Sequence, residues 1–193
     1  MNFLFENKII VIDEIINKEY QLLIKKNLFD KFFPWYFTPD ITNYEGNFQQ
    51  RPGFSHQFVD LKTSKIISNL HKLLIPLIQE SCKAINFDIV KITQGRSFLQ
   101  LPLNLKEDTV DTPHIDDVNR HLVVLYYVND SDGDTIIYEN LYEKKNQIIF
   151  NDLKIKQRVS PKMGRVVLFD GWLYHTASQP KNNNRCVVNY NVI

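Results

Sequence analysis

Two histidines and one aspartate are spaced so that they could share one metal ion. His114 and Asp116 stand two residues apart in the stretch Pro113-His114-Ile115-Asp116. Side chains two residues apart in extended backbone point to the same face, so both could occupy adjacent coordination positions. His175 follows an apolar run and the turn at residues 170–172. The three side chains would supply two imidazole nitrogens and one carboxylate oxygen.

This donor set indicates the kind of metal site. Two histidines and one carboxylate leave coordination positions open, which is typical of non-haem Fe(II) oxygenases. A closed zinc site would need a fourth protein ligand. The 2 cysteines, Cys82 and Cys186, are too few for a thiolate metal site or a disulfide scaffold. We therefore expect iron held by nitrogen and oxygen ligands.

Arg185 completes the candidate constellation and opens the last apolar run of the chain. A guanidinium can hold a carboxylate through two parallel hydrogen bonds. Inside a β barrel it would need such a partner, because an unpaired buried charge is costly. A dicarboxylic keto acid would offer one carboxylate to Arg185 while its keto-acid end chelated the metal.

The ordered set resembles the 2-oxoglutarate/Fe(II)-dependent dioxygenases, and its flanks resemble the prolyl 4-hydroxylase type. The similar segments cover roughly residues 90–193. They are the run Arg120-HLVVL-Tyr126-Tyr127-Val128-Asn129-Asp130, the glycine-containing turn Ser131–Thr135, and the Pro-x-x-Gly turn with its strand, Ser160–Phe169. A weaker similarity covers Ile10–Asp13 and the helix after it. The resemblance implies a double-stranded β-helix, that is, a cupin-like jelly roll.

The resemblance also implies roles for particular residues. His114, Asp116 and His175 would bind Fe(II), and Arg185 would pair with the far carboxylate of 2-oxoglutarate. Tyr127 matches the strand tyrosine that supports that carboxylate. The family tyrosine at the iron-chelating end has no clear match, and Gln100 or Asn104 could take its place. The implied reaction is hydroxylation of a C–H bond with release of succinate and CO2; ascorbate is a further cofactor candidate.

The elements that must position these residues divide the chain into a helical part and a β-rich part. Asn17 could cap a helix over Lys18–Phe29, and a second helix fits Thr63–Ile85, where Pro76 would kink or divide it. Residues 33–58 are predicted to form a long loop. Predicted strands are Lys8–Ile16, Asp88–Ile92, Arg96–Leu101, His121–Val128, Thr135–Glu139, Gln147–Phe150, Lys154–Ser160, Arg165–Phe169 and Arg185–Val192.

Composition narrows the class of protein. The 193 residues are 44% hydrophobic, which predicts one packed domain with a helical support over residues 1–87 and a jelly-roll core over 88–193. Charged residues interrupt the apolar N-terminus, and no apolar run approaches the ~20 residues of a membrane span. We therefore expect a cytoplasmic protein without a membrane partner. The formal net charge of +1 disfavours a nucleic-acid partner and leaves a small molecule or a peptide as substrate.

Two other functions stay open at this stage. Lys154, Lys156 and Arg158 alternate along one predicted strand and could form a basic face for a nucleic-acid-directed oxidative demethylase, or simply a solvated face. A catalytically silent jelly-roll binding module is the non-enzymatic alternative, since fold alone does not fix function. Substrate choice should depend on residues 33–58 and on Leu101–Thr112, where acidic residues could face a cationic substrate or solvent. The oligomeric state is not indicated.

Several other residues could contribute to a site, although a structural role is the expectation for most of them. Packing is expected for His71 and His121, whereas His56 lies in the predicted loop and could meet a substrate. Trp172 stands near His175 and could line a pocket. Arg120 could place a charge on the substrate side or form a surface ion pair.

Overall fold

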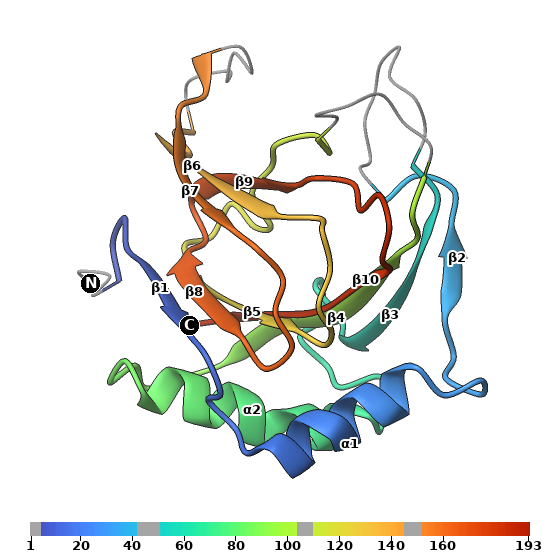
Figure 1. Ribbon diagram of the computed structural model, residues 1–193. Helices are drawn as coiled ribbons and strands as arrows, with labels where there is room; N and C mark the ends of the chain where they lie inside the picture. Colours follow the sequence, from blue (N-terminus) through green and yellow to red (C-terminus); the bar gives the residue numbers. More distant parts are fainter. Residues whose placement is uncertain (1–4, 42–50, 104–109, 145–151) are drawn as a thin grey trace.

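The fold is two antiparallel β-sheets that face each other, with two helices beneath the larger sheet (Figure 1). A computed structural model describes residues 5–41, 51–103, 110–144 and 152–193. The larger sheet has the strand order β1-β8-β5-β10-β4-β3-β2, and the smaller sheet has the order β7-β6-β9. Two facing antiparallel sheets form a jelly roll, and the sequence prediction of a mainly β fold with N-terminal helices is confirmed.

The element bounds follow the apolar patterns of the sequence. The helices are α1 (Lys18–Leu28) and α2 (His71–Lys83). The strands are β1 (Ile9–Ile12), β2 (Tyr36–Thr38), β3 (Gly53–Val59), β4 (Ile92–Gln100), β5 (Leu122–Tyr127), β6 (Thr135–Leu141), β7 (Ile155–Val159), β8 (Val166–Asp170), β9 (Leu173–Ala177) and β10 (Arg185–Val192). Asn17 caps α1 as predicted, because its side chain accepts a hydrogen bond from the Tyr20 amide at 2.9 Å.

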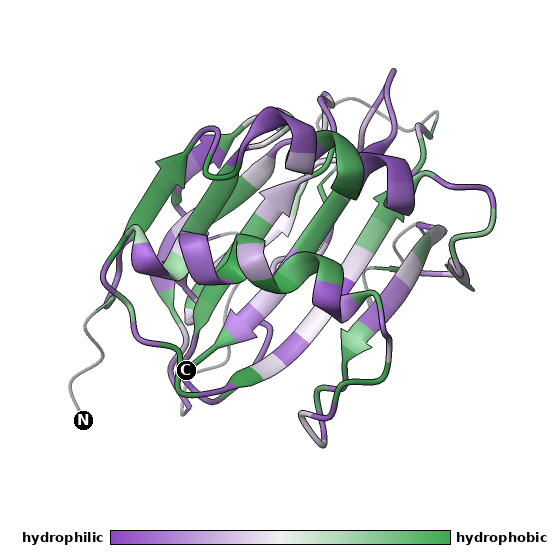
Figure 2. Ribbon diagram, turned by 90° about the horizontal axis from the view of Figure 1, so that it is seen from below, coloured by the Kyte–Doolittle hydropathy of each residue, from purple (hydrophilic) through white to green (hydrophobic). Residues whose placement is uncertain are grey.

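The helices pack on the outer face of the larger sheet and bury its apolar side chains. Figure 2 shows α1 and α2 crossing the strands on this side. Leu74, Leu77 and Ile78 of α2 are fully buried there. Pro76 lies inside α2 without ending it, since the buried stripe on both sides of the proline holds the helix on the sheet. Gly95 of β4 leaves room for the ring of Tyr190, which a Cβ at this position would overlap.

Three sequence predictions were wrong in detail. Residues 33–58 are not one loop, because β2 and β3 form there and extend the larger sheet. The helix predicted from Thr63 begins only at His71, since the Asp60 carboxylate accepts from the Thr63 amide at 2.8 Å and turns the chain back to β3. Residues 88–91 precede β4 rather than forming a strand. The predicted strand Gln147–Phe150 lies outside the described residues.

The space between the two sheets holds the second core and the site. Along β10, successive side chains point alternately toward the helices and toward the smaller sheet. Tyr126 belongs to the helix-side core and Tyr127 to the inner core, as their adjacent positions predict. The strand β9, which the sequence patterns did not indicate, pairs with β6 and carries His175. None of the helices in the described ranges has the length and apolar character that a membrane span requires.

Candidate metal and co-substrate site

A cavity of about 540 Å³ lies between the two sheets. Strands β3, β4, β5 and β10 of the larger sheet form one wall, and β9 with residues 111–116 forms the other. Its polar lining residues include both candidate histidines and two arginines, namely Ser55, Gln57, Arg96, Gln100, Asp111, His114, Asp116, Thr135, His175, Arg185 and Asn189. The candidate metal ligands and the candidate carboxylate-binding arginine therefore share one cavity.

The structure brings the three predicted metal ligands together. His114 and His175 are directly opposite each other in an isolated antiparallel bridge, with backbone hydrogen bonds of 3.0 Å in both directions. Asp116 follows two residues after His114, and its carboxylate lies close to both imidazole rings. Its carboxylate oxygens lie 3.7 Å from Nε2 of His114 and 3.9 Å from Nε2 of His175. One ligand atom from each residue lies within 4.8 Å of the others, which suits a single ion.

Backbone carbonyls fix the orientation of both imidazole rings. Nδ1 of His114 lies 3.0 Å from the Thr112 carbonyl, and Nδ1 of His175 lies 3.1 Å from the Leu173 carbonyl. A carbonyl can only accept, so each Nδ1 donates its proton, and in the neutral form of the ring Nε2 then carries the lone pair. Such outer hydrogen bonds orient metal-binding histidines. Both Nε2 atoms therefore face Asp116 in the form that binds a metal.

The charges of the cluster also suit a cation. The Asp116 side chain is fully buried, and Arg96 and Asn189 both donate to it, the latter at 2.9 Å. Burial alone would raise the pKa of Asp116, but Arg96 and the two histidines outweigh it and hold the pKa well below its usual range. Burial lowers the pKa of His175 to about 4. At neutral pH the cluster thus offers a carboxylate and a neutral His175 imidazole, as metal binding requires.

Arg185 is a buried cation without a carboxylate partner among the described residues. Its donors reach neutral oxygens only: the Gly133 carbonyl, Oε1 of Gln100 and Oγ1 of Thr135, each at 2.8 Å. Only 4% of its surface is exposed. Burying an unpaired charge costs on the order of several kcal/mol. An anionic ligand in the cavity would supply the missing countercharge.

Tyr127 and Gln100 both lie close to this guanidinium. The Tyr127 ring centroid lies 5.8 Å from the Arg185 guanidinium carbon, and its hydroxyl donates to Thr135 Oγ1 at 2.7 Å. Tyr127 faces inward as predicted but reaches the cavity only through Thr135, which lines it. Gln100 lines the cavity directly and donates to Asp111 Oδ2 at 3.0 Å. Asn104, the other predicted substitute for the family tyrosine, lies outside the described residues.

Sequence reasoning missed two charged pairs around the cavity. Arg96 bonds Asp116, and Arg51 bonds Asp111 with both side chains nearly buried. Asp111 is therefore not solvated, and burial raises its pKa against the opposing effect of Arg51. The alternation of Arg96, Phe98 and Gln100 along one strand was the available signal, since residues two apart share a face.

The other histidines that the sequence singled out have structural partners. The ring nitrogens of His56 lie 2.9 Å from the Pro34 carbonyl and 2.8 Å from Ser68 Oγ. His71 is bonded to the Tyr190 hydroxyl at 2.9 Å, and His121 to the Asn119 carbonyl at 2.7 Å. None of these three lines the cavity.

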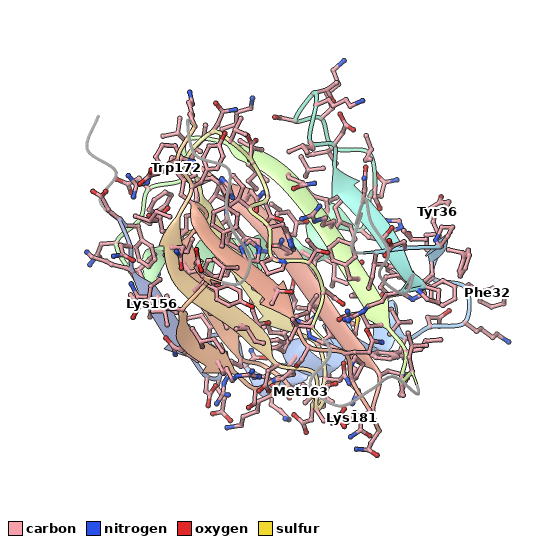
Figure 3. The ribbon with its side chains drawn as sticks, turned by 90° about the horizontal axis from the view of Figure 1, so that it is seen from above. Phe32, Tyr36, Lys156, Met163, Trp172 and Lys181 are labelled. Carbon is pink, nitrogen blue, oxygen red and sulfur yellow. The ribbon has the colours of Figure 1, made fainter. Side chains whose placement is uncertain are left out.

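The remaining surface candidates lie outside the cavity lining as well. Arg120 pairs with Asp170 at 2.6 Å and stacks over Trp172, which Figure 3 places at the margin of the molecule. On the predicted basic strand, Lys156 bonds the Asn7 carbonyl at 2.8 Å, and Arg158 lies 4.0 Å from Asp134. Two of its three cations thus have contacts within the chain.

Comparison with known proteins identifies the class of fold. No family model matches the chain, and no curated protein matches it. A 2OG-Fe(II) oxygenase family oxidoreductase from Burkholderia pseudomallei is similar with a TM-score of 0.69 and 9% identity, over 97% of this chain and 85% of that one. A Trichoplax adhaerens prolyl hydroxylase in complex with a hypoxia-inducible-factor peptide fragment gives a TM-score of 0.58 and 18% identity, over 97% and 84%.

A third similar structure has a small molecule bound. The epimerase SnoN, in complex with Fe³⁺, alpha-ketoglutarate and nogalamycin RO, gives a TM-score of 0.62 and 10% identity, over 96% of this chain and 78% of that one. At such identities the likeness establishes the fold. The chain has the double-stranded β-helix fold of the 2OG-Fe(II) oxygenases, and the fold implied by the sequence resemblance is confirmed.

Proposed function

We propose that the protein is a 2-oxoglutarate- and Fe(II)-dependent dioxygenase that hydroxylates a C–H bond of a small molecule or of a peptidyl residue such as proline. The observation that carries the proposal is the pairing of two incomplete sites in one cavity. The first is the cluster of His114, Asp116 and His175, and the second is the uncompensated charge of Arg185. Fe(II) and a dicarboxylic keto acid would complete both at once.

Each residue then has a definite task. His114, Asp116 and His175 would hold Fe(II), with the two Nδ1 hydrogen bonds keeping the imidazole rings aimed at it. Arg185 would bind the far carboxylate of 2-oxoglutarate, and Tyr127 would hold Thr135 in place beside that carboxylate. Bound there, Fe(II) with 2-oxoglutarate and dioxygen supplies the oxidant, and succinate and CO2 are released.

The similar structures and the contacts of the basic strand bear on the class of substrate. The similar structures include complexes with a peptide and with a small molecule, so either kind of substrate is compatible with this fold. The contacts of Lys156 and Arg158 within the chain give no support to a nucleic-acid substrate. Arg185 and all three metal ligands are present, which favours an enzyme over a silent binding module.

The test is an anaerobic titration with Fe(II) and 2-oxoglutarate, followed by visible absorbance. Wild-type protein should develop a charge-transfer band, and His175→Ala should not. His71→Gln is the matched control, because His71 lies on the helix side of the same sheet and should leave the band intact. Addition of oxygen and ascorbate should then yield succinate. A folded wild-type protein that binds neither Fe(II) nor 2-oxoglutarate would contradict the proposal.

A further inference from the structure

A second arginine, Arg96, lies in the same cavity and has no role in the function proposed above. It comes from β4, and its guanidinium carbon lies 4.9 Å from the centroid of the Phe98 ring. One Nη nitrogen donates to Asp116, while Nε is buried without a hydrogen-bond partner in the described structure. The side chain is 21% exposed. Its hydrogen-bonding capacity is therefore only partly used, and part of the group faces the cavity.

Among the described residues that line the cavity, Arg96 forms an ion pair with Asp116 and with no other acidic residue. Gln57 of β3 is its register partner, so the two side chains stand on the same face of neighbouring strands. The neutral residues that line the cavity include Thr38, Ile41, Ser55, Leu61, Phe98 and Ile115. Asp111 and Asp116 are the acidic residues among the described lining residues, and Arg51 already pairs with Asp111.

With Fe(II) and 2-oxoglutarate bound, the charges in and beside the cavity would sum to one net positive charge. Arg51 and Asp111 offset each other, and Arg185 would offset the far carboxylate of 2-oxoglutarate. The two charges of Fe(II) would be offset by Asp116 and by the keto-acid carboxylate. Asp116 would then be shared with the metal, so Arg96 would keep an uncompensated charge, which is costly in a partly buried position.

We propose that Arg96 binds a carboxylate of the substrate and so selects acidic substrates for oxidation. This inference rests on the proposed function, because the charge count assumes bound Fe(II) and 2-oxoglutarate. Arg96 touches a metal ligand, so a carboxylate that it holds lies close to the reacting centre. Apolar side chains that line the same cavity, such as Leu61 and Ile115, would contact the carbon skeleton of the acid. A free organic acid and an acidic residue in a peptide share this chemistry.

The test compares an acid with its neutral amide on the same protein. 3-Phenylpropanoate and 3-phenylpropanamide are titrated calorimetrically into protein loaded anaerobically with Mn(II) and saturating 2-oxoglutarate, which occupies Arg185. Wild-type protein should bind the acid about tenfold or more tightly than the amide, since hydrogen bonds to charged groups are the stronger ones. Arg96→Met should abolish the preference, and Arg96→Lys should keep part of it. The ratio cancels any change in metal affinity.

Gln57 provides a second variant that leaves the contact between Arg96 and Asp116 in place. Gln57→Glu puts a negative charge opposite Arg96 and should remove the acid preference, whereas Gln57→Met is the matched neutral control and should retain it. An acid-to-amide ratio that is the same in wild type, Arg96→Met and Gln57→Glu would overturn this inference. A wild-type protein that takes up neither Mn(II) nor 2-oxoglutarate would instead overturn the proposed function.

Discussion

The two faces of the larger sheet are built from the same strands but have opposite character. Toward the helices, β10 places Cys186, Val188, Tyr190 and Val192 in a closed apolar core. Toward the smaller sheet, the alternate residues Arg185 and Asn189 line the cavity together with Val187. Alternate residues of a strand face opposite sides of the sheet. Within β10, one set of residues therefore stabilises the fold and the other set lines the candidate site.

This contrast shows how the protein can place charges between two sheets. Burial of Arg185 and Asp116 opposes folding, and the helix-side core supplies apolar burial that offsets this cost. Loss of apolar packing on the helix side should therefore lower stability without changing ligand binding, and loss of polar groups on the cavity side should weaken ligand binding. Four predictions test that separation.

The largest expected effect is on the helix side. Leu77→Ala removes a fully buried side chain of α2 and leaves a cavity, so the free energy of unfolding should fall by about 2–5 kcal/mol. Chemical denaturation measures this. The affinity of the folded variant for 2-oxoglutarate should match that of wild type, and a parallel loss of affinity would mean that the two faces are coupled.

On the cavity side, Arg185→Met should give the opposite pattern. Loss of the guanidinium should weaken 2-oxoglutarate binding on the order of 100-fold, as measured by calorimetry with Mn(II) present. The free energy of unfolding in the absence of ligand should stay the same or rise, because a buried charge without a carboxylate partner is removed. Marked destabilisation would instead show that Arg185 mainly supports the fold.

Two adjacent tyrosines provide a matched pair across the sheet. Tyr127→Phe removes the hydroxyl that donates to Thr135, so unfolding should become easier by about 1 kcal/mol and 2-oxoglutarate affinity should fall modestly. Tyr126→Phe removes a buried hydroxyl that has no partner in the described structure, so its stability should be unchanged or higher. Equal effects of the two substitutions, in denaturation and binding assays, would argue against the assigned roles.

The smallest effect concerns pH on the helix side. Burial lowers the pKa of His71 below its usual value of 6.5. As the pH falls below 6.5, the imidazole of His71 therefore binds a proton in the unfolded chain before it does so in the folded protein. The free energy of unfolding that is present above pH 6.5 is consequently reduced as the pH falls toward the folded-state pKa. Between pH 7 and 5, His71→Gln should lose less stability than wild type in denaturation curves. An unchanged slope would assign the pH dependence elsewhere.

Much of the fold and the residues of the candidate metal site could be predicted from the sequence, because the signals were local. Asn17 marks the start of α1, and the alternation of residues 122–127 separates Tyr126 from Tyr127. The strands β2, β3 and β9 were missed. Strands β2 and β9 have only three and five residues, and β3 interrupts its apolar residues with glycine, serine, histidine and glutamine, so all three give weak patterns. The start of α2 was misplaced because the turn after Asp60 competes with the helix.

The sequence by itself determined which residues could bind a metal and a carboxylate, since residue types and their order along the chain carry that information. Only the tertiary structure decided what surrounds them. Arg96 meets Asp116, and Arg51 meets Asp111, across 20 and 60 residues of chain. Gln100 bridges Arg185 and Asp111. These contacts depend on which strands become neighbours, and that depends on packing of the whole sheet rather than on any local pattern.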